Sequence, residues 1–158
     1  MRASTTPALT AASAFAASAI LGAPPQAAAQ EAVTIAVAES DRYGSYLATA
    51  EGRPVYLFTT DTRGAADQEP RISCTSEACL AAWPLVTTQG APQAGEGVDA
   101  ALLGTMRAES GTVVTYAGWP LYTFARDAGA DAPQGQDIES FGGEWYLLTP
   151  QGEEVHAE

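Results

Sequence analysis

One ten-residue pattern occurs twice in this chain and constrains its fold more than any other feature. The segments GRPVYLFTTD (52–61) and GWPLYTFARD (118–127) share the pattern Gly-x-Pro-apolar-Tyr-x-Phe-x-x-Asp and lie 66 residues apart. Self-similarity at a fixed spacing is how repeated structural units show themselves in a sequence. We therefore expect two related halves that arose by duplication and pack as one body.

Both halves are predicted to be built from β-strands. Short segments rich in Val, Leu, Thr and Tyr are bounded by Gly, Pro and Asp, and none keeps a helical period beyond about two turns. The expected strands are 33–38, 45–50, 55–60 and 84–88 in the first half, and 103–108, 112–116, 121–126 and 144–149 in the second. We expect an all-β fold of two tandem β-meander repeats related by pseudo-two-fold symmetry.

Residues 1–29 have the features of a secretory signal peptide. They contain an early arginine, an Ala-rich apolar run and a small-residue Ala27-x-Ala29 cleavage site. The apolar run is shorter than the roughly 20 residues that span a bilayer, and no other stretch comes close. We expect a periplasmic or secreted protein with no transmembrane segment.

The chain beyond the leader, residues 30–158, is long enough for one domain but not for two independent ones. We divide this single two-repeat β-domain into four parts. They are repeat 1 (about 33–88), a linker (89–101), repeat 2 (about 102–150) and a C-terminal tail (151–158).

The charge pattern excludes several classes of function. The formal net charge is −12, which argues against nucleic acid and anionic lipid as partners. The chain has no lysine, so phosphate-loop and Schiff-base chemistry are excluded. The single histidine, His156, lies near the C-terminus, where we expect it to be solvated. We therefore predict no catalytic residues and no cofactor.

The two cysteines, Cys74 and Cys79, are predicted to form a local disulfide, because exported proteins fold in an oxidising environment. Four residues separate them, whereas dithiol oxidoreductases favour Cys-x-x-Cys, so a structural staple is favoured over a redox centre. Within this loop, residues 76–82 form the one expected helix, with Thr75 or Ser76 as its cap.

The glycine of each decapeptide is expected to end a two-residue hairpin loop, since glycine accepts the positive φ of tight turns. The resulting register pairs Ala50 with Arg53 and Tyr116 with Trp119.

The aromatic residues of the decapeptides are two apart, so Tyr56 and Phe58 share one face of their strand, as do Tyr122 and Phe124. We expect them to form an aromatic wall in the core. Trp83 is expected in the core too. Trp119, beside a turn, is the candidate for an exposed aromatic platform.

Asp61 and Asp127 end the two decapeptides, and two roles remain open for them. In the structural role, each carboxylate begins a turn and accepts a backbone N–H two residues on. In the functional role, the two carboxylates and the nearby tyrosines line a shared cleft for acid/base chemistry or a hard cation. The sequence does not identify a metal.

Taken together, several motifs resemble those of a bacterial family described as predicted lipoproteins with a Tyr-x-aromatic-x-x-Asp motif, also called the secreted repeat of unknown function. They are the double Tyr-x-Phe-x-x-Asp, the Cys-x4-Cys followed by AAWPL, and the closing GGEWYLLTP. The resemblance covers nearly all of residues 43–150 and implies two tandem copies of a β-rich repeat. Its motif positions are Tyr56, Phe58, Asp61, Tyr122, Phe124, Asp127, Trp83 and Pro84.

Many members of this family begin with a lipobox cysteine. The predicted signal peptide here contains no cysteine, so we do not expect a lipid anchor. With no catalytic constellation in view, the sequence favours a non-enzymatic envelope module that binds a partner protein or small ligand. The alternative is a carboxylate-centred site, for a cation or for acid/base chemistry, built from Asp61 and Asp127.

Overall fold

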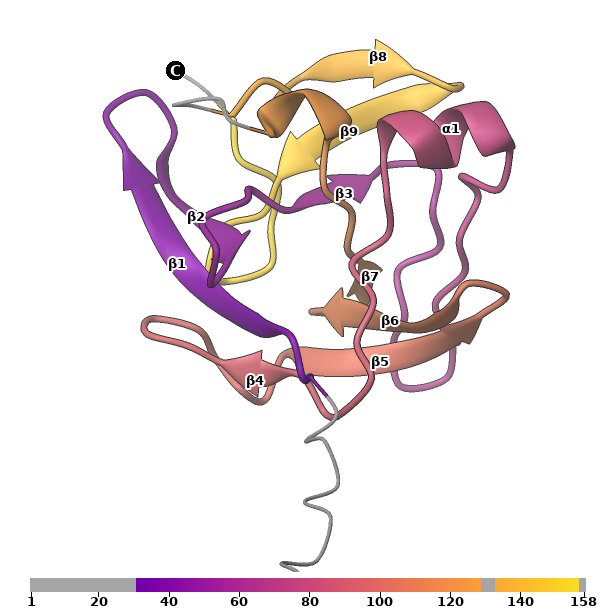
Figure 1. Ribbon diagram of the computed structural model, residues 1–158, viewed down its shortest axis with the longest axis horizontal. Helices are drawn as coiled ribbons and strands as arrows, with labels where there is room; N and C mark the ends of the chain where they lie inside the picture. Colours follow the sequence, from indigo (N-terminus) through magenta and orange to yellow (C-terminus); the bar gives the residue numbers. More distant parts are fainter. Residues whose placement is uncertain (1–30, 129–132, 157–158) are drawn as a thin grey trace, which may run out of the picture.

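The computed structural model describes residues 31–128 and 133–156, so the predicted signal peptide lies outside the described residues. Figure 1 shows their arrangement, with α1 at the upper right of the view and β8 at the top. In chain order the elements are β1 (Thr34–Ser40), β2 (Gly44–Thr49), β3 (Tyr56–Phe58), α1 (Glu77–Ala82), β4 (Gln93–Ala94), β5 (Leu103–Ala108), β6 (Gly111–Tyr116), β7 (Trp119–Pro120), the 3-10 helix η1 (Ala125–Asp127), β8 (Ile138–Ser140) and β9 (Gly143–Leu147).

The strands form three small sheets, which confirms the prediction of a mainly β protein. Their strand orders are β2-β1-β4, β3-β9-β8 and β5-β6-β7. The disulfide joins Cys74 and Cys79 as predicted. The short helix begins inside this loop but continues past Cys79 to Ala82, so it does not lie wholly within the loop as expected. Ser76 caps this helix, because its Oγ accepts the Cys79 N–H at 3.2 Å. Within the described residues, no helix combines the length and apolar character needed to cross a bilayer.

Each half of the chain is completed by the last strand segment of the other half. β9, from the second half, pairs with β3 of the first, where Phe58 lies opposite Trp145. In the opposite direction, residues 84–88 of the first half bridge to the second half, at Leu85 with Tyr122 and at Thr87 with Val113. Sequence periodicity indicates strands and not their partners, so this exchange was not foreseeable. Each half therefore depends on the other half for a pairing partner.

The register of the first hairpin differs from the prediction by one residue. The prediction paired Ala50 with Arg53. In the structure, Ala48 bridges to Pro54 instead. The Thr49 N–H donates to the Arg53 carbonyl at 2.8 Å, so the loop holds three residues instead of two. The extra residue shifts every pairing beyond it.

The second hairpin has the predicted register. Tyr116 pairs with Trp119, and the two loop residues, Ala117 and Gly118, have φ values of 48° and 85°. A two-residue loop with both central residues at positive φ matches the twist of the flanking strands.

The expected linker and C-terminal tail both pack against the domain. The linker contains β4, and β8 lies in the segment between η1 and β9. The expected tail folds back: Glu154 bridges to Leu148, and Val155 is only 4% exposed. Short, polar segments of this kind acquire their structure from tertiary partners rather than from local propensity.

Candidate functional site

The two copies of the decapeptide meet at their tyrosines. The Tyr56 N–H donates to the Tyr122 carbonyl at 2.8 Å, and the Tyr122 N–H donates to the Tyr56 carbonyl at 3.0 Å. This reciprocal antiparallel pair lies at the centre of the molecule and joins the two halves through their backbones. Side-chain contacts on either side of it occur in matched pairs, although the pseudo-two-fold relation between the halves stays a prediction.

Each motif tyrosine donates to the aspartate of the other copy. The Tyr56 hydroxyl lies 2.7 Å from Asp127 Oδ2, and the Tyr122 hydroxyl lies 2.7 Å from Asp61 Oδ2. Both tyrosines are fully buried, and the two aspartates are 6% and 5% exposed. The recurrent Tyr-x-Phe-x-x-Asp spacing therefore serves contacts between copies, since buried polar groups must find partners.

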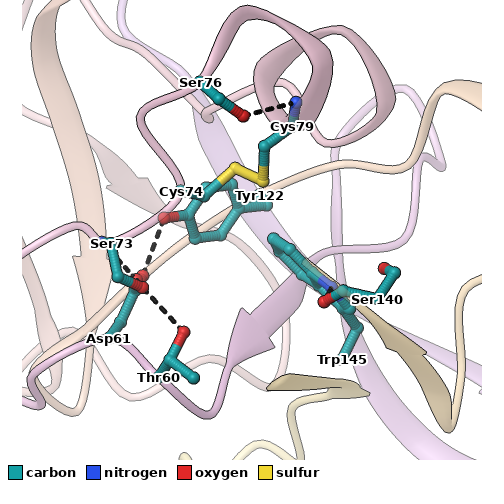
Figure 2. Close-up of a disulfide and its surroundings, with 9 residues drawn as sticks. All are labelled: Thr60, Asp61, Ser73, Cys74, Ser76, Cys79, Tyr122, Ser140 and Trp145. Carbon is teal, nitrogen blue, oxygen red and sulfur yellow. Dashed lines mark hydrogen bonds between the residues drawn. A yellow bond between two sulfur atoms is a disulfide. The ribbon is translucent and has the colours of Figure 1, made fainter. Parts of the chain in front are cut away.

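Asp61 has two more hydrogen bonds, both to Ser73 (Figure 2). The Ser73 N–H and its hydroxyl each donate to Asp61 Oδ1 at 2.7 Å. Ser73 directly precedes Cys74, so the residue next to the disulfide-closed loop supplies two of the three donors. Asp61 was expected to accept a backbone N–H within its own turn; its partners come instead from a segment twelve residues later.

Asp127 is held by the segment that follows η1. The Gln134 N–H donates to Asp127 Oδ1 at 2.7 Å, and the Gly135 N–H donates to the Tyr56 hydroxyl at 3.1 Å. A Cβ atom at Gly135 would lie 2.8 Å from both the Tyr56 and the Trp83 rings. Glycine is thus required here for close approach of the backbone to the Tyr56 hydroxyl.

Burial raises the pKa of Asp61 above its usual value, while hydrogen bonds from Ser73 and Tyr122 act in the opposite direction. Burial likewise raises the pKa of Asp127, opposed by the hydrogen bonds from Tyr56 and Gln134. Burial and the adjacent carboxylates raise the pKa of both tyrosines. The phenols therefore remain protonated donors.

Four aromatic rings stack between the two Tyr–Asp bridges. Their order is Phe124, Trp83, Trp145, Phe58, with ring centroids 4.1, 4.0 and 4.0 Å apart. Tyr56 contacts Trp83 edge-on at 5.3 Å, and Tyr122 contacts Trp145 edge-on at 5.0 Å. The motif aromatics thus form the centre of the core, and no side chain of this stack faces solvent.

Trp119 is half-buried at the end of the second hairpin. The Arg63 guanidinium lies 5.7 Å from the centroid of its ring and is held there by the Ala117 carbonyl at 2.8 Å and by Glu153 at 3.4 Å. One face of the predicted aromatic platform is therefore covered by a cation–π contact.

A pocket of about 360 Å³ lies between the disulfide loop and β5. Its lining residues are Pro70, Arg71, Ile72, Cys74, Thr75, Leu80, Leu85, Met106, Arg107, Ala108, Glu109 and Ser110. Four partly buried apolar side chains form its floor, and two exposed arginines lie at its rim. Neither arginine belongs to the ion pairs found within the described residues, which are Arg63–Glu153 and His156–Glu154.

Sequence reasoning did not identify Arg71 or Arg107, because the pocket brings together segments that are distant in the chain. It also missed Ser73 and Gln134 as partners of the aspartates, since both contacts use backbone N–H groups that carry no sequence signal, and the additional Ser73 hydroxyl contact joins positions twelve residues apart. Within the described part of the chain, no group of three or more His, Cys, Asp or Glu side chains is placed to hold a metal ion.

Residues 104–149 match the model of a family described as a secreted repeat of unknown function. The matched range contains the second decapeptide and β9, in agreement with the resemblance seen in the motifs. The family description fits an uncharacterised exported protein. No curated protein and no solved structure gives a significant match to the chain.

Proposed function

We propose that this protein is a non-enzymatic binding module outside the cytoplasm, and that its ligand site is the pocket between the disulfide loop and β5. The observation that carries the proposal is the contrast between two sets of polar groups. Every carboxylate and hydroxyl of the repeated motif binds another group of the fold. Within the described residues, the side chains of Arg71 and Arg107 have no such partner, and they line a pocket together with apolar side chains.

The chemistry of the pocket selects a ligand with an apolar body and an anionic group. Ile72, Leu80 and Met106 offer apolar contact, and arginine binds carboxylates and related anions through its planar fork of donors. The volume of about 360 Å³ falls within the range of small-ligand sites, about 300–1,000 Å³. On a chain with a net charge of −12, two arginines against one glutamate in the lining of this pocket form a local anion-attracting region.

The location belongs to the same proposal. A signal peptide at residues 1–29 would deliver the chain to the periplasm or the medium, and the absence of cysteine from it argues against a lipid anchor. Envelope proteins and small ligands are then the accessible partners.

A second candidate function places acid/base chemistry or cation binding at Asp61 and Asp127. The raised pKa values of both carboxyls favour it, because perturbed pKa values cluster at functional sites. Calcium titration followed by thermal melting tests the cation form: a rise in Tm at millimolar calcium, lost in Asp61→Asn, would support it. An unchanged Tm would remove it.

The binding proposal can be tested with 8-anilinonaphthalene-1-sulfonate, which pairs an apolar ring system with one anion. We expect fluorescence enhancement with the wild type and about fivefold weaker binding to Arg71→Ala or Arg107→Ala, equivalent to about 1 kcal/mol for an exposed charge pair. Arg42→Ala, at a site outside the pocket, is the matched control and should bind as the wild type does. Equal binding by all four proteins would contradict the proposed site.

A further inference from the structure

β5 is an edge strand with backbone groups available for pairing. In its sheet it neighbours β6 alone. The Ala117 N–H donates to the Leu102 carbonyl at 2.8 Å, and hydrogen-bonded positions alternate along an antiparallel pair. The backbone groups of Thr105 and Arg107 therefore point away from β6, and within the described residues no hydrogen bond to another segment joins them.

The first half of the chain shows that this kind of edge accepts another strand. β1 occupies the same place as β5, since each begins the hairpin that precedes a decapeptide. The edge of β1 is covered by the linker: β4 pairs with it in parallel, and the Val37 N–H donates to the Glu96 carbonyl at 3.2 Å. The corresponding edge of β5 has no such cover.

β5 also lacks the features that normally protect an edge. Its sequence, LGTMRA, has no proline and one charged residue, whereas exposed edges are usually blocked by proline, several charges or very short strands. Both Thr105 and Arg107 are solvent-exposed. An unprotected edge of six residues is suited to pairing with another chain.

Hollows on both faces of β5 would receive the side chains of an added strand. Met106 and Ala108 line the ligand pocket from one face of β5, and Leu103 and Thr105 line a second hollow of about 480 Å³. Arg107 also lines the ligand pocket, although it alternates with Met106 along the strand and so lies on the face of Leu103 and Thr105. Side chains of a strand alternate between the two faces of a sheet. Every second side chain of an added strand would therefore face the ligand pocket.

Charge favours an acidic partner segment and opposes a second copy of this chain. Arg71 and Arg107 flank the pocket, with Glu109 as the one acidic residue that lines it. Two copies would each bring a net charge of −12, and such self-repulsion disfavours association.

We propose that β5 pairs with an extended segment of a partner polypeptide, which places an apolar side chain in the pocket and an acidic side chain against Arg71 and Arg107. The inference rests on the proposed function, because it assigns a class of ligand to the same pocket. Main-chain hydrogen bonds to Thr105 and Arg107 supply affinity, and the pocket supplies selectivity.

The test uses the protein purified from an exporting host and a displayed library of random decapeptides. Enriched peptides are expected to carry an apolar residue and an acidic residue within two positions of each other. A synthetic copy of the leading peptide should bind Thr105→Pro at least tenfold more weakly than the wild type, because proline removes the outward N–H. Thr105→Ala, which keeps that N–H, should bind within twofold of the wild type.

A second measurement does not depend on the folding of a protein variant. Two versions of the synthetic peptide are compared, one N-methylated at its odd-numbered backbone amides and the other at its even-numbered ones. One version should lose binding, because its methyl groups block the amides that pair with β5, and the other should bind normally. Failure to enrich any peptide, equal binding to Thr105→Pro, or indifference to both N-methylation patterns would overturn the inference. Sedimentation that shows a dimer sensitive to Thr105→Pro would overturn it too, in favour of self-pairing.

Binding of 8-anilinonaphthalene-1-sulfonate, measured on the same samples, separates this inference from the proposed function. Arginine-dependent dye binding without peptide binding would overturn the paired strand and leave the pocket as a small-ligand site. Loss of arginine dependence for both probes would overturn the pocket itself. Normal dye binding by Thr105→Pro would show that this variant is folded.

Discussion

The two Tyr–Asp bridges use the same atoms at the same distance, but they are held by different kinds of segment. Asp61 accepts two bonds from Ser73, next to a disulfide that closes a short helical loop. Asp127 accepts one bond from Gln134, in a segment with no covalent constraint. The repeated residues thus make matching contacts, while the segments that support them differ in length, sequence and crosslinking. The two copies of the decapeptide therefore share the Tyr–Asp contacts that connect the halves, and not the segments that support those contacts.

The largest effects are expected from the tryptophans beside the two bridges. Trp83→Ala and Trp145→Ala should each lower the free energy of unfolding by about 3–5 kcal/mol, the usual cost of a large aromatic cavity. The double variant should lose less than the sum, because the two rings stack on each other. Urea unfolding measures all three, and strict additivity would show that the stack is not one unit.

The two aspartates should differ in the next experiment. Asp61→Ala removes the acceptor of three hydrogen bonds, one of them from a Ser73 hydroxyl that also contacts Thr60 Oγ1 at 2.8 Å, and should cost about 3 kcal/mol. Asp127→Ala removes the acceptor of two and should cost about 2 kcal/mol. Asp67→Ala, at an exposed position, is the control and should change stability by less than about 0.5 kcal/mol. Equal losses for Asp61 and Asp127 would erase the proposed difference between the bridges.

Removal of the disulfide should cost about 2 kcal/mol, the chain-entropy value for so short a loop. The variant is Cys74→Ala with Cys79→Ala, measured by thermal and urea unfolding. Because Ser73 adjoins Cys74, this change should couple to Asp61→Ala and be additive with Asp127→Ala. A double-mutant cycle with the reverse pattern would contradict the assignment of the loop to one bridge.

The smallest expected effect concerns pH. A carboxyl whose pKa is raised on folding binds its proton more tightly in the native state, so its contribution to stability increases as pH falls through the raised pKa towards 3.8. The Tm difference, wild type minus the double variant Asp61→Asn/Asp127→Asn, should therefore increase as the pH is lowered from 7 to 4. A falling difference would mean that hydrogen bonding outweighs burial at these carboxyls.

Local patterns predicted the elements that carry strong local signals. β5 has the predicted bounds, α1 begins after the predicted cap Ser76, and the disulfide joins the expected cysteines. The Tyr116–Trp119 register was predicted correctly from a two-residue turn. The register predicted for the first hairpin was wrong, because a glycine at this position is compatible with a three-residue loop as well.

Contacts between distant segments were beyond prediction from one sequence. The crossing of Tyr56 to Asp127 and Tyr122 to Asp61 depends on the antiparallel pairing of the two copies, which neither decapeptide encodes alone. The short strands β4 and β8 form because neighbouring strands supply hydrogen bonds. Arg71 and Arg107 meet only after the disulfide loop has packed near β5.

The exchange of final strand segments has a consequence for how the protein matures. A chain is made from its amino end, so β3 forms its pairing only when β9, among the last segments of the sequence, is present. Until then the edge of β3 that β9 covers is unpaired. A polypeptide that stops before β9 would have no finished sheet around Tyr56, so synthesis through β9 is a condition for a complete core.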